Sequence, residues 1–367
     1  MKHLIIIALL TLLVCIPAAA QTQQYELGVI AIRGEDGRWS LRYVEPGTEN
    51  MHLASLSSTG REASRLGIYS IMQDPPDRPI PFSSPLWLPF VSQKHDGTIP
   101  NDPGWPLQWN MRAIGLRRQS GSEGATIAVL DTGWGWPEDS PEIIAMWDAV
   151  DEDNDPTSTV EHGTHVASIA LAPHNYLGLA GACGECRAII VRVCQSMTCA
   201  ESDIAEGIQF AVANGASVIN LSLAGPDDMP YLHQTVDDAL EAGVVVVAAA
   251  GNYGEMVQYP AAWPGVIAVG AVDVNLSVPW TSGTGPHIAF AAPGVDVPGS
   301  CGQDLYCYMS GTSMAAPHVS GAFGLLLTKH PDWTPQQAYD LLKQTAVDLG
   351  EDGWDEFCGW GMVQVPQ

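Results

Sequence analysis

Short apolar runs alternate with segments of helical pattern from Ala125 onward, and this alternation limits the fold more than any other feature of the chain. The runs are apolar at consecutive positions, as expected for strands covered on both faces. They span residues 125–130, 188–193, 217–222, 244–250 and 266–271. We expect helices at His162–Leu171, Ser202–Asn214, Leu232–Ala242, Ser313–His330 and Pro335–Thr345. This order predicts a three-layer α/β/α fold with a mostly parallel central sheet.

Polar side chains stand where sites form in such a fold, at the carboxyl ends of strands and the amino ends of helices. Asp131 and Asn252 each follow an apolar run. His162 and Ser313 each open a helical segment, where unpaired backbone N–H groups and the helix dipole favour developing negative charge. A carboxylate, an imidazole, a hydroxyl and an amide donor are together the parts of an acyl-transfer site.

Four stretches resemble the signature motifs of subtilisin-like serine proteases, the subtilases: "VLDTG", "HGTHVAS", "AAAGN" and "GTSMAAPHVSG". Their order is that of the family, and the resemblance covers about residues 101–363, including the closing "GWGMV". It implies that Ser313 is the nucleophile, His162 the general base and Asp131 the group that orients the imidazole. The Asn252 side chain and the Ser313 backbone N–H would then form the oxyanion hole.

Two other functions are compatible with parts of this pattern. His162 and His165 lie one turn apart and could hold zinc, but "HGTH" lacks the Glu and the third ligand of a zinc hydrolase. We therefore expect His165, and likewise His318, to be packed inside the domain. A pseudoprotease or inhibitor-like binding protein on the same fold is the second alternative, and the presence of all four active-site residues argues against it.

Substrate-binding residues follow from the resemblance, which implies protein or peptide substrates. An extended peptide would pair as an added strand with Ser222, Leu223, Ala224 and Gly225. Ala224 stands where the family more often has Gly. Gly251 and Gln258 would lie at the primary specificity pocket. Asp227 and Asp228 could favour basic substrate residues, or they could be solvated loop charges.

Calcium is the cofactor that the resemblance implies, and two segments could bind it. The stretch "DEDNDP" supplies hard oxygen ligands in a turn-prone segment, including the carboxylates of Asp151, Asp153 and Asp155. The stretch "APHNYLGLAG" resembles the calcium loop of the family and contributes Asn175. Asp102 and Glu142 would complete that site, although relatives usually have Asp where Glu142 stands. The alternative for each segment is a solvated acidic loop.

The first twenty residues are typical of an export signal. Lys2 and His3 precede the apolar run Leu4–Ile16, and the small residues Ala18–Ala20 provide a cleavage site. The run is short for a membrane span. We therefore expect a secreted or periplasmic protein that is monomeric and has no membrane contact after signal removal.

Residues 21–100 are expected to be a pro-segment and Pro-rich linker, and residues 101–367 the catalytic domain. The stretches "YELGVIAIRG" and "RWSLRYVEP" predict two strands, and Gln73–Pro100 is too rich in Pro for regular structure. In the family such a segment assists folding and blocks the cleft until self-cleavage. We expect the cut between Pro81 and Asn101.

The cysteines predict disulfides, and the net charge argues against one class of partner. Exported chains usually form disulfides, and the short spacings favour Cys194–Cys199 and Cys301–Cys307, with Cys358 left unpaired. The alternative for the cluster that begins with Cys183-Gly-Glu-Cys186 is a zinc knuckle.

The 41 acidic residues against 15 Lys and Arg give a net charge of −26. Because phosphate binding needs clustered cations, this balance argues against nucleic-acid binding.

Overall fold

The computed structural model describes strands at residues 28–33, 39–44, 68–70 and 78–79, and residues 98–119, 124–254, 256–303 and 305–365. The chain divides into two compact units, residues 1–66 and 67–367. In the first unit, β1 (Gly28–Arg33) pairs antiparallel with β2 (Trp39–Val44), so both strands predicted there are present. The expected signal peptide lies outside the described residues, as do residues 81–97 of the interval in which we expect the cut.

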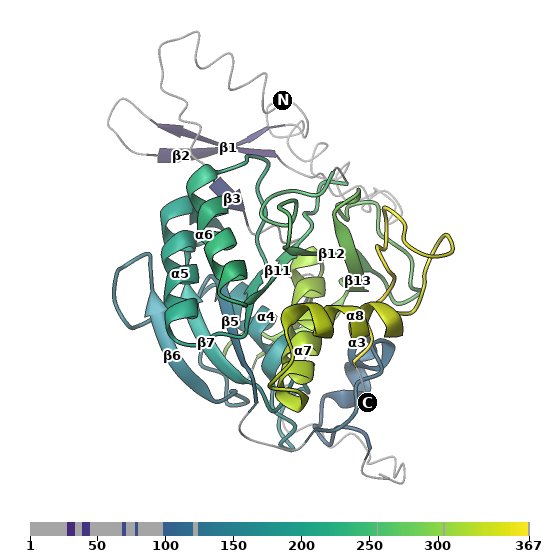
Figure 1. Ribbon diagram of the computed structural model, residues 1–367. Helices are drawn as coiled ribbons and strands as arrows, with labels where there is room; N and C mark the ends of the chain where they lie inside the picture. The colour runs from purple at the N-terminus through teal and green to yellow at the C-terminus, as the bar shows by residue number, and fades with distance from the viewer. Residues whose placement is uncertain are drawn as a thin grey trace, which may run out of the picture. The chain divides into compact units, whose positions relative to one another are not determined.

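A seven-stranded parallel sheet forms the centre of the second unit, as the sequence predicts (Figure 1). The strand order is β13-β12-β11-β10-β5-β7-β6. The strands are β5 (Thr126–Asp131), β6 (Ile143–Asp148), β7 (Arg187–Arg192), β10 (Val218–Leu221), β11 (Val245–Ala249), β12 (Ile267–Val272) and β13 (Ile288–Pro293). The five central strands coincide with the five predicted apolar runs, whereas β6 and β13 were not predicted.

Two pairs of helices cover the two faces of this sheet. Ile127 and Val129 of β5 pack in the cluster that includes α4 (His162–Leu171) and α7 (Thr312–Lys329). Ala128 and Leu130 pack instead in the cluster built by the second pair of helices. That pair is α5 (Glu201–Ala213) and α6 (Pro230–Glu241), which lie side by side in Figure 1. Since successive strand residues point to opposite faces, the three predicted layers are confirmed.

Helices α4 and α7 are buried along most of their length. On α7, a Cβ at Gly324 would lie 2.6 Å from Ile127 Cδ1, so glycine permits the close contact between helix and sheet. Helix α8 (Pro335–Thr345) follows, with the capping box of Thr334 and Gln337 at its start. The short helix α3 (Trp109–Ala113) precedes β5. Within the described part of the chain, no helix is both long and apolar enough to cross a membrane.

Two disulfide-closed hairpins lie outside the main sheet, and each pairs with a short strand from the N-terminal side of the chain. Cys194–Cys199 joins β8 (Cys194–Gln195) to β9 (Thr198–Ala200), and β3 (Ile68–Ser70) pairs with β9. Cys301–Cys307 joins the ends of β14 (Val297–Ser300) and β15 (Tyr306–Met309), and β4 (Arg78–Pro79) pairs with β15. Both predicted disulfide pairings are confirmed. The prediction that Gln73–Pro100 has no regular structure is wrong at Arg78–Pro79, which form β4.

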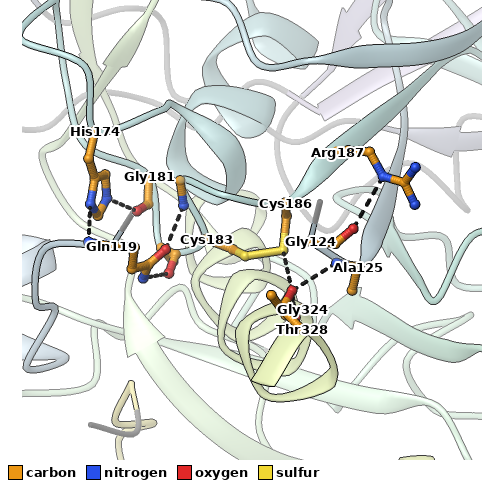
Figure 2. The surroundings of a disulfide bond; sticks show 12 residues. Gln119, Gly124, Ala125, His174, Gly181, Cys183, Cys186, Arg187, Gly324 and Thr328 are labelled. Atoms are coloured by element: carbon orange, nitrogen blue, oxygen red, sulfur yellow. Dashed lines mark hydrogen bonds between the residues drawn. A yellow bond between two sulfur atoms is a disulfide. The ribbon is translucent and has the colours of Figure 1, made fainter. Parts of the chain in front are cut away.

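A third disulfide joins Cys183 to Cys186 (Figure 2), so the zinc-knuckle alternative is wrong because these sulfurs are bonded to each other. The backbone N–H of Gly184 in this turn donates to Gln119 Oε1 at 2.8 Å. The Gln119 backbone N–H donates to His174 Nδ1 at 2.9 Å, which anchors the start of the "APHNYLGLAG" loop. Among the cysteines of the described residues, Cys358 is free and buried, as predicted.

Candidate active site

Asp131 and His162 meet at the carboxyl edge of the sheet. Strand β5 ends at Asp131 and α4 begins at His162. His162 Nδ1 lies 2.8 Å from Asp131 Oδ1, and both side chains are almost fully buried. Because a carboxylate accepts, this contact places the imidazole proton on Nδ1 and leaves the lone pair on Nε2. His162 Nε2 is therefore oriented as a base.

The turn after β5 sets the position of α4. Thr132 Oγ1 accepts a hydrogen bond from the Gly163 backbone N–H at 2.9 Å, which holds the first turn of the helix against the strand end. A Cβ at Gly163 would lie 2.5 Å from the Gly133 carbonyl oxygen. Glycine after the histidine therefore permits the close approach that brings His162 to Asp131.

Ser313 lies in the first turn of α7, next to the substrate-binding segment. Its hydroxyl donates to the Ser222 carbonyl oxygen at 3.1 Å, and the Ser222 hydroxyl donates to the Ser313 carbonyl oxygen at 2.8 Å. His162 Nε2 is buried and has no hydrogen-bond partner among the described residues. The nucleophile–base hydrogen bond is thus not formed in this conformation. Rotation of the Ser313 side chain away from the Ser222 carbonyl is needed for it to form.

Asn252 follows β11 and is fixed by the residue that precedes Ser313. Asn252 Oδ1 accepts from the Thr312 backbone N–H at 2.8 Å and from the Thr312 hydroxyl at 2.9 Å. The Thr312 hydroxyl also accepts from the Gly251 backbone N–H at 3.1 Å. These contacts define Oδ1 as the acceptor end of the amide, so Nδ2 is the donor end. The structure therefore brings the predicted oxyanion donor to the nucleophile.

The predicted substrate-binding residues lie together beside Ser313. Gly225 exchanges two backbone hydrogen bonds with Tyr259, at 2.9 and 3.0 Å. Gln258 precedes Tyr259 and packs on Gly251, where a Cβ would lie 2.9 Å from Gln258 Oε1. The segment is buried at all four positions, Ser222, Leu223, Ala224 and Gly225. The specificity roles of these residues remain predictions.

The other two motif histidines are packed in the interior, as expected. His165 Nε2 lies 3.1 Å from the Val297 carbonyl oxygen, and burial lowers the pKa of His165 to about 3. His318 Nδ1 donates to the Met314 carbonyl oxygen at 2.9 Å, and burial lowers the pKa of His318 to about 4. Both rings are therefore neutral at pH 7. No cluster of three or more His, Cys, Asp or Glu in the described ranges could hold a metal ion.

Two buried carboxylates face the loop that carries Asn175. Asp102 Oδ1 accepts from the backbone N–H groups of Asn175 and Tyr176 at 2.9 and 3.1 Å. Asp139 Oδ1 accepts from Asn175 Nδ2 at 3.1 Å. Burial raises the pKa of Asp102 to about 6 and that of Asp139 to about 7. Two such carboxylates near one another suit a bound cation, which would offset the cost of burying their charges.

Carboxylate oxygens, which calcium prefers as ligands, lie beside this loop, and one carboxylate belongs to a residue that the sequence did not single out. Asp102 Oδ2 is buried and has no hydrogen-bond partner among the described residues, so it has an oxygen to offer. Glu142 is exposed, and the carboxylate that contacts the side chain of Asn175 is that of Asp139, three positions earlier. The ligand role of Glu142 remains a prediction. The signal for Asp139 was present in the acidic stretch "PEDSPE", but the sequence does not show which acid turns inward.

The "DEDNDP" segment uses its carboxylates in other contacts. Arg192 Nη1 donates to Asp151 Oδ2 and to Asp148 Oδ2, each at 2.6 Å. Asp153 Oδ1 accepts from the Asp155 backbone N–H at 2.8 Å, and Asp155 in turn accepts from the Thr157 hydroxyl. The structure does not gather three of these carboxylates around one point, and calcium binding here remains a prediction.

Comparison with known proteins agrees with this geometry. The model of the Subtilase family matches residues 122–361. The chain is 37% identical to subtilisin DY of Bacillus licheniformis over 67% of this chain and 91% of that protein. It is 34% identical to the minor extracellular protease Epr of Bacillus subtilis over 70% of this chain, and it spans only 41% of the length of Epr. A solved protease from Pseudoalteromonas arctica superposes with a TM-score of 0.65 at 28% identity, covering 73% of this chain and 98% of that chain. The family model matches more than half of the chain, and the chain carries Asp131, His162, Asn252 and Ser313 in the arrangement described above. The chain therefore belongs to the subtilase family.

Proposed function

We propose that the chain is a secreted serine endopeptidase that hydrolyses peptide bonds through an acyl-enzyme on Ser313. The observation that carries the proposal is the 2.8 Å contact between His162 Nδ1 and Asp131 Oδ1. This contact selects the tautomer that can accept the Ser313 proton. A pseudoprotease would need no such oriented base.

In the proposed mechanism, an extended peptide binds along Ser222–Gly225 and the Ser313 hydroxyl turns from the Ser222 carbonyl to His162 Nε2. Ser313 Oγ attacks the scissile carbonyl carbon while its proton passes to Nε2, and Asp131 stabilises the resulting imidazolium. The carbonyl oxygen becomes an oxyanion that accepts from Asn252 Nδ2 and the Ser313 backbone N–H. The intermediate collapses when His162 protonates the leaving amine. Water then attacks the acyl-enzyme with the same base.

Calcium is proposed as a structural cofactor held by Asp102, Asp139 and Asn175. When bound, it supplies positive charge to two carboxylates whose burial otherwise disfavours ionisation. The backbone contacts of Asp102 with Asn175 and Tyr176 would then anchor the loop to the segment before α3. The ion would thus act through stability and not through the chemical step.

Residues 21–100 are proposed as the pro-segment that assists folding and blocks the cleft, with export directed by residues 1–20. The mature enzyme, proposed to comprise residues 101–367, would act on proteins or peptides as a monomer. The extracellular location named for the Epr relative supports export.

The test is inhibition by a serine-directed phosphonyl fluoride, followed by mass mapping. We expect stoichiometric loss of peptidase activity with the adduct on Ser313, and no effect of a transition-metal chelator. An active preparation that resists the reagent, or a folded protein with neither activity nor adduct, would refute the assignment. The second of these results would favour the pseudoprotease alternative.

A further inference from the structure

The side-chain amide of Gln258 lies against Gly251, the residue before Asn252, and carries an acceptor without a partner. Gln258 is 9% exposed, and its Oε1 is buried with no hydrogen-bond partner among the described residues. The side chain runs across Gly251, where a Cβ would lie 2.9 Å from Oε1, 3.2 Å from Cδ and 3.3 Å from Cγ of Gln258. Because an unpaired buried acceptor costs free energy, this oxygen calls for a donor from a bound molecule.

Backbone contacts fix the place of this amide between two parts of the site. The Gln258 N–H donates to the carbonyl oxygen of Ala250 at 3.0 Å, directly after β11 and two residues before Asn252. The Tyr259 N–H donates to the carbonyl oxygen of Gly225 at 3.0 Å. Gln258 thus joins the strand end that carries the proposed oxyanion donor to the segment expected to pair with substrate.

A substrate residue whose carbonyl oxygen reaches Asn252 brings its side chain to the same place. Its backbone pairs with Ser222–Gly225 while its carbonyl oxygen faces Asn252, so its side chain enters between the two segments that Gln258 joins. The terminal torsion of a glutamine is soft, and Oε1 can turn from Gly251 toward that side chain. The amide of Gln258 is therefore the polar group that the residue before the scissile bond would meet.

The surroundings of the amide favour an uncharged donor. Val257 precedes Gln258 and Ala250 accepts from its backbone, and both of these apolar residues are buried. A charge brought into such a place needs a charged partner, which a neutral amide does not provide. A hydroxyl or an amide N–H can donate to Oε1 without that cost.

We propose that Gln258 is a specificity-determining residue, and that it selects substrates with Asn, Gln, Ser or Thr immediately before the scissile bond. The inference rests on the proposed function, because it names the substrate class of that same site. A bound hydroxyl or amide gives Oε1 its missing donor. An apolar side chain of the same shape leaves the oxygen unpaired, so hydrogen bonding and not size sets the preference.

The experiment uses internally quenched peptides that differ only in the residue before the scissile bond. Two pairs match in shape, Asn with Leu and Thr with Val, and mass spectrometry identifies the cleaved bond. In wild type, kcat/KM should be about tenfold higher for the polar member of each pair, as expected when a buried acceptor gains a neutral donor.

Two substitutions of Gln258 separate its acceptor from its volume. Gln258→Met keeps the volume and removes the acceptor, so the apolar member of each pair should become the better substrate. Gln258→Glu keeps an acceptor and adds a negative charge. It should keep the preference for Asn over Leu and newly accept Lys at the same position.

The matched control is Gln234→Met, the same substitution at an exposed glutamine of α6 whose Nε2 donates to Asp238. Its ratios between polar and apolar substrates should equal those of wild type. The inference is overturned if wild type cleaves after Leu and Val as fast as after Asn and Thr, or if Gln258→Met keeps the wild-type ratios. Either result leaves the protease assignment standing, and the wild-type ratios decide even if Gln258→Met does not fold. If none of the proteins hydrolyses any of the peptides, the proposed function itself fails.

Discussion

Two substitutions of Asn252, to Leu and to Asp, separate the two roles of its side-chain amide. Nδ2 is the proposed donor to the oxyanion, whereas Oδ1 accepts two hydrogen bonds from Thr312, at 2.8 and 2.9 Å. Asn252→Leu removes both functions. Loss of a single oxyanion donor lowers kcat by about 10²–10³-fold. Leaving the Thr312 backbone N–H and hydroxyl without this acceptor should also cost about 1–3 kcal/mol of unfolding free energy.

Asn252→Asp keeps the acceptor for Thr312 and replaces the donor by a second carboxylate oxygen. Its thermal stability should therefore stay near wild type, while kcat falls at least as far as in Asn252→Leu. The assay is steady-state kinetics on processed enzyme together with thermal unfolding of both variants. The reasoning would be refuted if Asn252→Asp kept kcat within a few-fold of wild type. A rise in KM alone would instead place Asn252 in ground-state substrate binding.

Three further predictions concern processing, calcium and pH. In a host without other exported proteases, Ser313→Ala should accumulate as a precursor that retains the residues after the signal. Maturation of this variant in that host would show that cleavage does not use Ser313. Calcium chelation should shorten the inactivation half-life at elevated temperature. Asp139→Asn should reduce this effect of calcium, whereas Glu142→Gln should leave it unchanged. The reverse pattern would identify Glu142 as the ligand in place of Asp139. Burial lowers the pKa of His165 to about 3 and that of His318 to about 4, below the unfolded value of 6.5. Because the unfolded chain therefore binds more protons at these two histidines, they should lower the unfolding free energy as pH falls from 6.5 toward 4. Because the raised pKa values of Asp102 and Asp139 give the opposite slope over the same range, the measurement is urea unfolding of Ser313→Ala protein that also carries Asp102→Asn and Asp139→Asn, and a flat profile of that protein would contradict the burial of neutral rings.

The sequence predicted the centre of the sheet but missed both of its edges. The five predicted strands are the five inner ones, whose continuous apolar runs reflect burial on both faces. The two missed strands, β6 and β13, are the edge strands. Strand β6 carries the apolar run Ile143–Trp147, which the prediction overlooked. Strand β13 is rich in Ala and ends at Pro293, so its strand signal is weak.

The candidate site shows a similar division between what local sequence specifies and what the fold decides. Asp131, His162, Ser313 and Asn252 could be predicted as site residues because each stands at the end of a strand or the start of a helix in a specific motif. The inward turn of Asp139 depends on how residues 132–142 fold against the Asn175 loop, and spacing alone does not specify it. The contact of Arg192 with Asp148 and Asp151 likewise joins neighbouring strands of the sheet, which the acidic segment itself cannot reveal.

The central claim is that Ser313 forms a covalent acyl-enzyme with the help of His162. The most direct measurement is to mix mature enzyme with an excess of an activated ester substrate, quench with acid within the first turnover, and map the acyl group by mass spectrometry. We predict about one acyl group per molecule, located on Ser313, with accumulation strongly slowed in His162→Ala. An acyl group on another residue, or full ester turnover in Ser313→Ala, would contradict the account.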